Sequence, residues 1–311
     1  MRHSPAMTHV GPPYTRLLLA TEHSEQDAGA ERVALAMAQR CGLPLQAVLP
    51  LALNAEFESV APELAAHADA QAAQRRQALQ ALAGKAGVAC EIHVRRATEL
   101  HEAIVETACS LHCDLILTRR RGQRGVLARL LVGEMVSRVV AHAPCSVLLV
   151  PTQATMWSQR VCCAVDPAAP AMSAVDQAAR VAATCGLPLD LVAVVAADTQ
   201  REAAEAVLLG AQERAEAQGA QTHLQVRVGR VHEAVLQAAA EGGADLLVIG
   251  RHGPQPLGGL QGLARAWLGG AAQKIIGLAA SPVLVVVESD AVSGPDGAAT
   301  TDDGFQGRSK T

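Results

Sequence analysis

Four glycines near the C-terminus have the spacing expected of an anion-binding loop. Gly250 and Gly253 flank His252 directly after an aliphatic run, and Gly269 and Gly270 precede the next helix-like segment. Glycines let the backbone approach an anion closely, and a helix N-terminus offers unpaired N–H groups and a favourable dipole. These residues therefore predict a phosphate cradle, although neither a Walker A motif nor a dinucleotide fingerprint is present to name the ligand.

Each candidate residue also has a plainer structural explanation. Gly250 and Gly253 are equally suited to a tight turn between a strand and a helix. Asp166, which precedes a proline, either contacts a ligand or caps the turn that follows it. His252 and His101 have no evident nucleophilic partner, so neither one predicts catalysis. The sequence leaves these alternatives open.

Composition narrows the classes of function. The chain has 311 residues, enough for two domains, with 50% hydrophobic residues, five aromatics and a net charge of −4. Such a chain lacks both the basic surface and the aromatic stacking platforms that nucleic-acid binders use, so nucleic acid is an unlikely partner. There is no apolar run of about 18 residues and no signal-peptide pattern, which argues against membrane insertion and secretion and favours the cytoplasm.

The eight cysteines show no Cys-x-x-Cys spacing and lie mostly in apolar periodic segments. This pattern predicts small buried thiols in a reducing compartment. Cys109, His112 and Cys113 are the nearest approach to a metal set, but helical spacing separates His112 from Cys109 and a fourth ligand is lacking. We therefore predict no metal site.

An internal repeat decides the architecture. The pentapeptide Cys-Gly-Leu-Pro-Leu occurs at 41–45 and 185–189, and His-Glu-Ala occurs at 101–103 and 232–234. The offset between the copies falls from 144 to 131 residues, so the second copy has lost about 13 residues from its middle helical region. The chain is a tandem repeat of one unit.

Each copy alternates strand-like and helix-like hydrophobic periods, which predicts a parallel sheet covered by helices on both faces. Gly42 and Gly186 are expected to end helices. The strands are predicted at 17–20, 45–51, 88–94, 114–118 and 146–150 in the first copy, and at 161–165, 189–195, 222–228, 245–250 and 282–287 in the second. Ligands of such sheets bind beyond the carboxyl ends of the strands.

The domain organisation follows from the repeat. We predict a disordered N-terminus at 1–13, a first domain at 14–151, a linker at 152–157, a second domain at 158–287 and a disordered tail at 288–311. The tail is rich in Gly, Ser, Thr and Asp, with too little apolar content to pack.

On these motifs the chain resembles the universal stress protein family, whose nucleotide-binding members carry Gly-x2-Gly-x9-Gly-Ser/Thr after the fourth strand. Asp245 to Gly253, Gly269 and the closing strand at 280–286 carry the resemblance in the second copy, and 130–135 and 142–150 carry it in the first. The resemblance implies an α/β fold of two tandem five-stranded parallel sheets with strand order 3-2-1-4-5. It also implies that the fifth strands pair, making the two copies an intramolecular pseudodimer and leaving a homodimer possible.

The resemblance further implies a site for ATP or a related adenine nucleotide in the second copy, with no catalytic residue and no metal. Fifteen residues separate Gly253 from Gly269, and Gly270 stands where the family has Ser or Thr. The residues expected to contact the nucleotide are Asp166, Val194, Gly250, His252, Gly253, Gly269 and Gly270.

The first copy departs from the family pattern at the same positions. Arg119 replaces the first glycine, Glu134 replaces Ser or Thr, and Glu22 stands in place of Asp166. A carboxylate beside bound phosphates repels them, so we predict a degenerate site. The basic cluster from Arg119 to Arg129 is either solvated surface or an unorthodox anion site that binds phosphate, an acidic partner or RNA.

The leading functional prediction is a cytoplasmic stress-response binding module in which nucleotide binding alters contacts with an unknown protein partner. One alternative is a nucleotide-free interaction scaffold. A weak ATP hydrolase ranks lower, because the sequence offers no convincing general base, metal-binding carboxylate pair or P-loop lysine.

Overall fold

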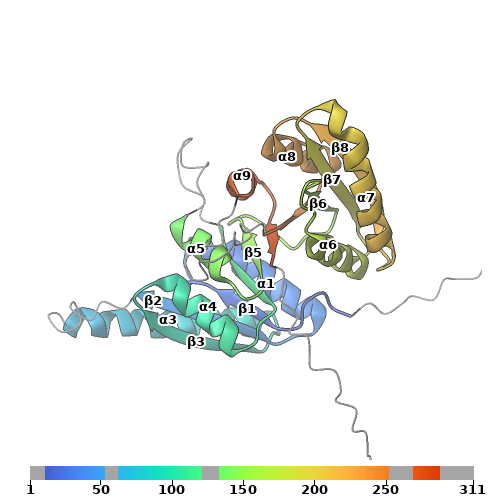
Figure 1. Cartoon of the computed structure of the whole chain (residues 1–311). Helices are drawn as coiled ribbons and strands as arrows, with labels where there is room; N and C mark the ends of the chain where they lie inside the picture. Colours follow the sequence, from blue (N-terminus) through green and yellow to red (C-terminus); the bar gives the residue numbers. More distant parts are fainter. Residues whose placement is uncertain (1–10, 53–61, 121–132, 252–268, 288–311) are drawn as a thin grey trace, which may run out of the picture.

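A computed structural model describes residues 11–52, 62–120, 133–251 and 269–287 of the chain. Two halves with the same order of strands and α-helices follow one another, and we call them domain 1 and domain 2 (Figure 1). The elements of domain 1 are β1 (Leu17–Ala20), the 3₁₀ turn η1 (Glu25–Asp27), α1 (Ala28–Cys41), β2 (Leu45–Ala52), α3 (Pro62–Lys85), β3 (Cys90–Ala97), α4 (Leu100–Ser110), β4 (Leu115–Arg119), α5 (Glu134–His142) and β5 (Ser146–Val150). Those of domain 2 are β6 (Val161–Val165), α6 (Met172–Cys185), β7 (Pro188–Val195), η3 (Asp198–Gln200), α7 (Arg201–Glu216), β8 (Gln221–Val228), α8 (Val231–Gly242), β9 (Leu246–Gly250), α9 (Gly270–Leu278) and β10 (Val283–Val286).

The strands of the described residues form a single sheet in the order β3-β2-β1-β4-β5-β10-β9-β6-β7-β8. Neighbours within each domain are parallel, and each domain has the predicted order 3-2-1-4-5. At the seam, β5 and β10 pair antiparallel, with Leu148 opposite Leu284. The predicted pairing of the fifth strands is confirmed, and it merges the two expected sheets into one.

The strand sequences explain their places in the sheet. The central strands β1, β4 and β5 are buried along their whole length, as aliphatic parallel strands covered on both faces must be. The edge strand β3 runs from Cys90 to Ala97 instead of the predicted 88–94, since Arg95 and Arg96 still pair with β2. An edge strand tolerates such polar residues because one side of it faces water.

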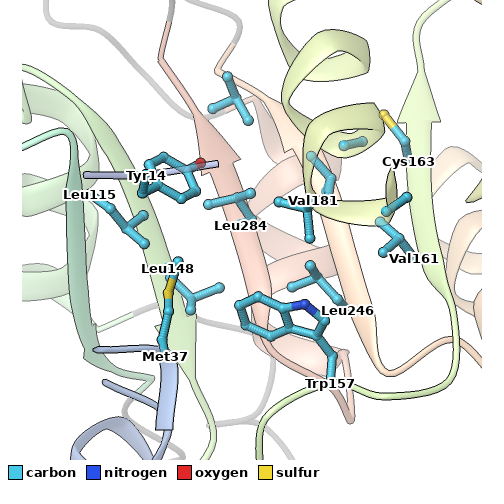
Figure 2. Packing of buried hydrophobic residues seen from close by; sticks show 14 of the residues in the cluster. Tyr14, Met37, Leu115, Leu148, Trp157, Val161, Cys163, Val181, Leu246 and Leu284 are labelled. Carbon is cyan, nitrogen blue, oxygen red and sulfur yellow. The ribbon is translucent and has the colours of Figure 1, made fainter. Parts of the chain in front are cut away.

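Helices cover both faces of the sheet and complete two hydrophobic cores. One core lies under α1, α3, α6 and α7, and the other under α4, α5, α8 and α9. Figure 2 shows the first core crossing the seam, where Met37 and Leu148 of domain 1 lie near Leu284 and Val181 of domain 2. Each core is continuous between the domains, so the two halves bury apolar surface together.

The ends of the first helices and the shorter middle region of domain 2 agree with the sequence predictions. Gly42 and Gly186 adopt left-handed backbone conformations with φ of 65° and 66°, and they end α1 and α6 as predicted. The region between the second and third strands holds the 24-residue α3 in domain 1 and the 16-residue α7 in domain 2. The difference lies where the repeat offset changes.

The segments before and between the domains pack against helices. The carbonyl oxygens of Gly11 and Pro13, predicted to belong to a disordered N-terminus, accept hydrogen bonds from α6. In the linker, Trp157 is buried and the Arg32 guanidinium of α1 donates to the Ala154 carbonyl over 2.6 Å. The predicted disorder of 1–10 and 288–311 lies outside the described residues.

The cysteines are free thiols, but they are not all buried. Cys113, Cys162 and Cys163 are buried, whereas Cys109 is exposed, so the prediction of a buried thiol is wrong there. Cys109 sits in the last turn of α4, on the side that faces water. Within the described ranges, no group of three or more metal-binding side chains has a metal-site arrangement. The helices of those ranges include none that is both long and apolar enough to cross a membrane.

Candidate nucleotide site

A pocket of about 170 Å³ opens at the carboxyl ends of β6, β7 and β9 in domain 2. This is the edge where parallel α/β sheets bind ligands. The walls are almost entirely aliphatic, with one carboxylate. The lining residues are Ala164, Val165, Asp166, Pro167, Val192, Val194, Val231, Val235, Ile249, Gly250, Ala271, Ala272 and Ile275.

Asp166 is the ionisable side chain of this lining, and it follows β6 directly. Its Oδ1 accepts a hydrogen bond of 2.9 Å from the backbone N–H of Ala168, so it also closes the turn that begins at Pro167. The carboxylate is exposed at the pocket edge. Asp166 therefore caps this turn, and its contact with a ligand stays a prediction.

Val194 and Gly250, both predicted to contact a nucleotide, line the pocket from the ends of two strands. Gly250 is required by packing rather than by a turn conformation. A Cβ built there would lie 2.5 Å from the Cβ of Ala171 at the start of α6. Only glycine allows β9 to approach α6 this closely, and the same close approach leaves the strand end open to the pocket.

The N-terminus of α9 closes another side of the pocket. Gly269 is the N-cap residue, without a side-chain cap, and Gly270 begins the helix. The first N–H groups of a helix have no partner within it, and here neither glycine brings a hydroxyl or carboxylate to fill that role. Ala271 and Ala272, in the same turn, line the pocket. The structure thus brings a helix N-terminus to the site, while His252 and Gly253 lie outside the described residues.

Sequence reasoning centred on the glycines missed the aliphatic walls. Ile249, Val192 and Val231 line the pocket, and Val231 is 44% exposed. The available signal was positional, because residues at the carboxyl ends of the first, second and fourth strands of such a sheet face the ligand edge. Apolar residues there look like ordinary core in a sequence.

Comparison with known proteins decides the family. The pattern of the Universal stress protein family matches residues 13–151 and again 158–287, most of the chain. The chain belongs to the universal stress protein family. A universal stress protein of Synechocystis sp. is 28% identical over an alignment of 152 positions that covers 44% of this chain and 97% of that protein.

Solved structures support the same fold. A universal stress protein from Archaeoglobus fulgidus superposes with a TM-score of 0.63 at 18% identity, covering 91% of this chain and 99% of its own. A functionally unknown protein from Pseudomonas aeruginosa PAO1 gives a TM-score of 0.60 at 19% identity, covering 92% of this chain and 96% of its own. The tandem arrangement therefore recurs over the whole length of both proteins.

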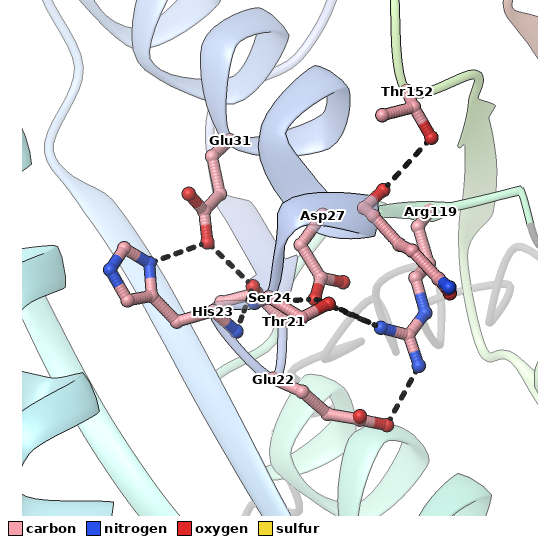
Figure 3. Close-up of polar contacts among 9 residues, drawn as sticks. Thr21, Glu22, His23, Ser24, Asp27, Glu31, Arg119 and Thr152 are labelled. Atoms are coloured by element: carbon pink, nitrogen blue, oxygen red, sulfur yellow. Dashed lines mark hydrogen bonds and ion pairs between the residues drawn. The ribbon is translucent and has the colours of Figure 1, made fainter.

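Domain 1 of this universal stress protein carries a polar cluster where domain 2 has small apolar residues (Figure 3). The Arg119 guanidinium, 4% exposed, donates to Asp27 Oδ2 and Glu22 Oε1 over 2.9 Å each, and to Ser24 Oγ over 3.0 Å. Asp27 is 1% exposed. Glu22, the counterpart of Asp166, is thus paired with a cation of its own domain.

A second group of polar residues adjoins the first. The buried carboxylate Glu31 accepts a 2.7 Å hydrogen bond from the Thr21 hydroxyl and lies 2.9 Å from Nδ1 of His23 (Figure 3). Three carboxylates therefore gather at this end of domain 1. The Arg119 guanidinium compensates one of these charges, and the carboxylates in excess of it disfavour a phosphate.

Residue equivalence shows how the two domains diverged. When β1 is aligned with β6 and β4 with β9, Asp27 corresponds to Ala171 and Arg119 to Gly250. Domain 1 holds a buried ion pair at the contact where domain 2 holds an alanine against a glycine. The Arg119–Asp27 pair therefore stands in domain 1 where the Gly250–Ala171 pair stands in domain 2. The two positions must change together, since a buried Arg or Asp opposite a small apolar residue would lack its partner charge.

The structure describes Arg119 and Arg120 of the basic cluster. Both donate to groups of the protein, which fits neither the solvated surface nor the anion site that the sequence suggested. Arg119 is buried and bound to carboxylates, so it is neither solvated surface nor open to an anion. Arg120 donates to the Ala279 carbonyl of domain 2. Arg121, Arg124 and Arg129 lie outside the described residues.

His101 also has a structural place. It is buried on α4, with its ring centroid 5.4 Å from that of His142 on α5. Burial, together with the nearby charges of Arg138 and His142, lowers the pKa of His101. No nucleophilic side chain contacts it among the interactions of the described residues.

Proposed function

We propose that domain 2 binds an adenine nucleotide and that the chain works as a stress-response binding module rather than a catalyst. The base would enter the aliphatic pocket and the ribose hydroxyls would meet Asp166. The phosphates would extend toward the open N-terminus of α9. The observation that carries this proposal is the joining of an apolar pocket, a carboxylate and an uncapped helix N-terminus at one sheet edge.

The size and lining of the pocket favour a flat apolar group as its occupant. Its volume of about 170 Å³ is smaller than the roughly 300–1,000 Å³ of pockets that enclose whole drug-sized ligands. A purine ring fits this description better than a complete nucleotide does. The charged part of the ligand would then remain at the rim, close to the N-terminus of α9.

Relatives indicate which ligands to test first. Universal stress proteins that match less than half of this chain have been solved in complex with cAMP and, in Archaeoglobus fulgidus, with dAMP. Both ligands have an adenine base and one phosphate. The lack of a hydroxyl at Gly270 removes a hydrogen bond to phosphate worth roughly 1–3 kcal/mol, so weak selectivity for ATP over AMP is expected.

Two other functions remain in competition. A nucleotide-free scaffold would act through its surface alone on a protein partner. A weak hydrolase would need a general base at the phosphates, and the described lining supplies one carboxylate, placed at the turn after β6. We favour binding in the cytoplasm, with the ligand altering contacts to a partner.

Titration calorimetry of the full chain with AMP, cAMP and ATP tests the proposal. Saturable binding of at least one of them is expected, with no release of labelled phosphate from ATP above a boiled control. Absence of binding by all three would favour the scaffold. Phosphate release above the control would favour the hydrolase.

A further inference from the structure

Two arginines cross the seam between the domains in opposite directions. Arg120 follows β4 of domain 1, and its guanidinium donates to the carbonyl oxygen of Ala279, the C-cap residue of α9 in domain 2. Arg251 follows β9 of domain 2 and reaches the end of α5 in domain 1. Its guanidinium donates over 3.1, 3.3 and 3.2 Å to the carbonyl oxygens of Val140, Ala141 and Ala143.

The contacts of Arg120 and Arg251 are equivalent, because each guanidinium donates to the C-cap carbonyl of the last helix in the other domain. Ala143 is the C-cap residue of α5 just as Ala279 is of α9. The backbone N–H groups of Arg120 and Arg251 donate over 2.8 Å to the last residues of β5 and β10 respectively. Each arginine is therefore fixed to the fifth strand of its own domain and holds the last helix of the other.

The chemistry of a helix end explains the choice of arginine. The final carbonyl groups of a helix have no partner within it, and they carry the negative end of the helix dipole. A guanidinium offers five donors in a rigid plane and keeps its charge when partly buried. Burial lowers the pKa of both arginines, but the helix carbonyls provide the hydrogen bonds that a partly buried cation requires.

The contact made by Arg120 bears on the ligand site. The helix α9 spans nine residues, about 13 Å at 1.5 Å per residue. Its C-cap is held by domain 1, while Ala271, Ala272 and Ile275 of the same helix line the pocket. A short helix transmits a displacement at one end to the other, because its backbone bonds make it stiff.

We infer that domain 1 positions the ligand-facing helix of domain 2 through Arg120, and that Arg251 makes the reverse contact on α5. Domain 1 then acts as a brace, by which we mean that its Arg120 holds α9 in place beside the pocket of domain 2. The nucleotide part of this inference rests on the proposed function, whereas the bracing of α9 does not. Arg120 is a positioning residue, with no place in the pocket lining.

Hydrogen exchange followed by mass spectrometry tests the brace on the ligand-free full chain. Arg120→Ala should speed exchange in residues 270–278 by roughly tenfold or more, while residues 134–142 keep their rate. Arg251→Ala should do the reverse. Arg32→Ala, which removes an arginine bond to the linker carbonyl of Ala154, should leave both helices unchanged. Arg120→Lys should restore part of the protection.

Unchanged exchange of α9 in Arg120→Ala would overturn the brace, as would equal acceleration of both helices in all three alanine variants. With AMP as the probe, Arg120→Ala should weaken binding roughly tenfold and Arg32→Ala should leave it at the parent value. If the parent chain binds no adenine nucleotide, the proposed function fails while the exchange pattern still decides the brace. Loosened α9 with unaltered AMP affinity would contradict the link between brace and site.

Discussion

The carboxyl ends of β1 and β4 in domain 1 and those of β6 and β9 in domain 2 began as equivalent positions and now differ in kind. Domain 1 holds Arg119 among Asp27, Glu22 and Ser24, with every group bonded to another. Domain 2 holds small apolar residues, one exposed carboxylate and a pocket. The difference shows that one fold can hold either a group of mutually bonded polar side chains or a small apolar pocket at equivalent strand ends.

The fold survives this exchange because the sheet and the helices do not depend on it. Both domains keep the same strand order and the same glycine-capped first helix. The domains also differ in the lengths of α3 and α7, but this contrast lies in the residues that end and follow the strands, where loops carry function on a fixed scaffold. The retained domain 1 then serves domain 2 through the shared cores and the arginines at the seam.

The largest effect is expected when the ion pair of domain 1 is broken. Arg119→Met leaves Asp27 buried without its cation, which should lower the free energy of unfolding by about 3–5 kcal/mol. Urea unfolding followed by circular dichroism measures this loss. The double variant Arg119→Gly with Asp27→Ala reproduces the pair of domain 2 and should recover a substantial part of it. If Arg119→Met were as stable as the parent, the ion pair between Arg119 and Asp27 would not stabilise domain 1.

The complementary change in domain 2 should cost less. Gly250→Ala brings a Cβ to within 2.5 Å of the Ala171 Cβ and should lower the free energy of unfolding by about 1–3 kcal/mol. Adding Ala171→Gly should relieve the clash. If the double variant were no more stable than Gly250→Ala alone, the close approach of β9 and α6 would not be what requires glycine.

A third change separates the two roles of Asp166. Asp166→Asn keeps a side-chain oxygen for the N–H of Ala168, so the free energy of unfolding should stay within about 0.5 kcal/mol of the parent. AMP affinity should fall roughly tenfold, because a neutral acceptor bonds a ribose hydroxyl more weakly than a carboxylate does. Calorimetry and thermal unfolding measure the two effects. An unchanged affinity would leave Asp166 as a turn cap alone.

The smallest effect concerns pH and domain 1. The pKa of His101 is lowered in the folded state, where burial comes first and Arg138 and His142 add to it, while Glu102 and Glu99 act the other way. As pH falls below about 6.5, the unfolded chain therefore binds a proton at His101 before the folded chain does. His101 thus lowers the free energy of unfolding below that pH and leaves it unchanged above it. His101→Gln should flatten the fall in unfolding free energy between pH 7 and 5. An unaltered slope would assign the pH dependence to other groups.

The repeat and the positions of the strands follow from the internal duplication and the hydrophobic period, whereas the strand order and the pairing of the fifth strands were implied by the resemblance to the family. The residues for which the resemblance implied a ligand contact include Asp166, Val194 and Gly250, and all three line the pocket. The sequence did not predict that Arg119 is buried, because an arginine in a basic run looks exposed until Asp27, far away in the chain, is placed beside it. The seam contacts of Arg120 and Arg251 were equally hidden, since their partners are backbone carbonyls without a sequence signature.

The number of adenine nucleotides bound per chain, measured by calorimetry with a matched pair of variants, tests the central claim most directly. Val231 and Leu100 are the first residues of α8 and α4, so a glutamate at either position suits its helix, while only Val231 lines the described pocket. The parent should bind one AMP per chain, Leu100→Glu should bind as the parent does, and Val231→Glu should lose at least tenfold in affinity. Two nucleotides per chain, or binding that survives Val231→Glu and fails in Leu100→Glu, would contradict the division between a ligand-binding domain 2 and a filled domain 1.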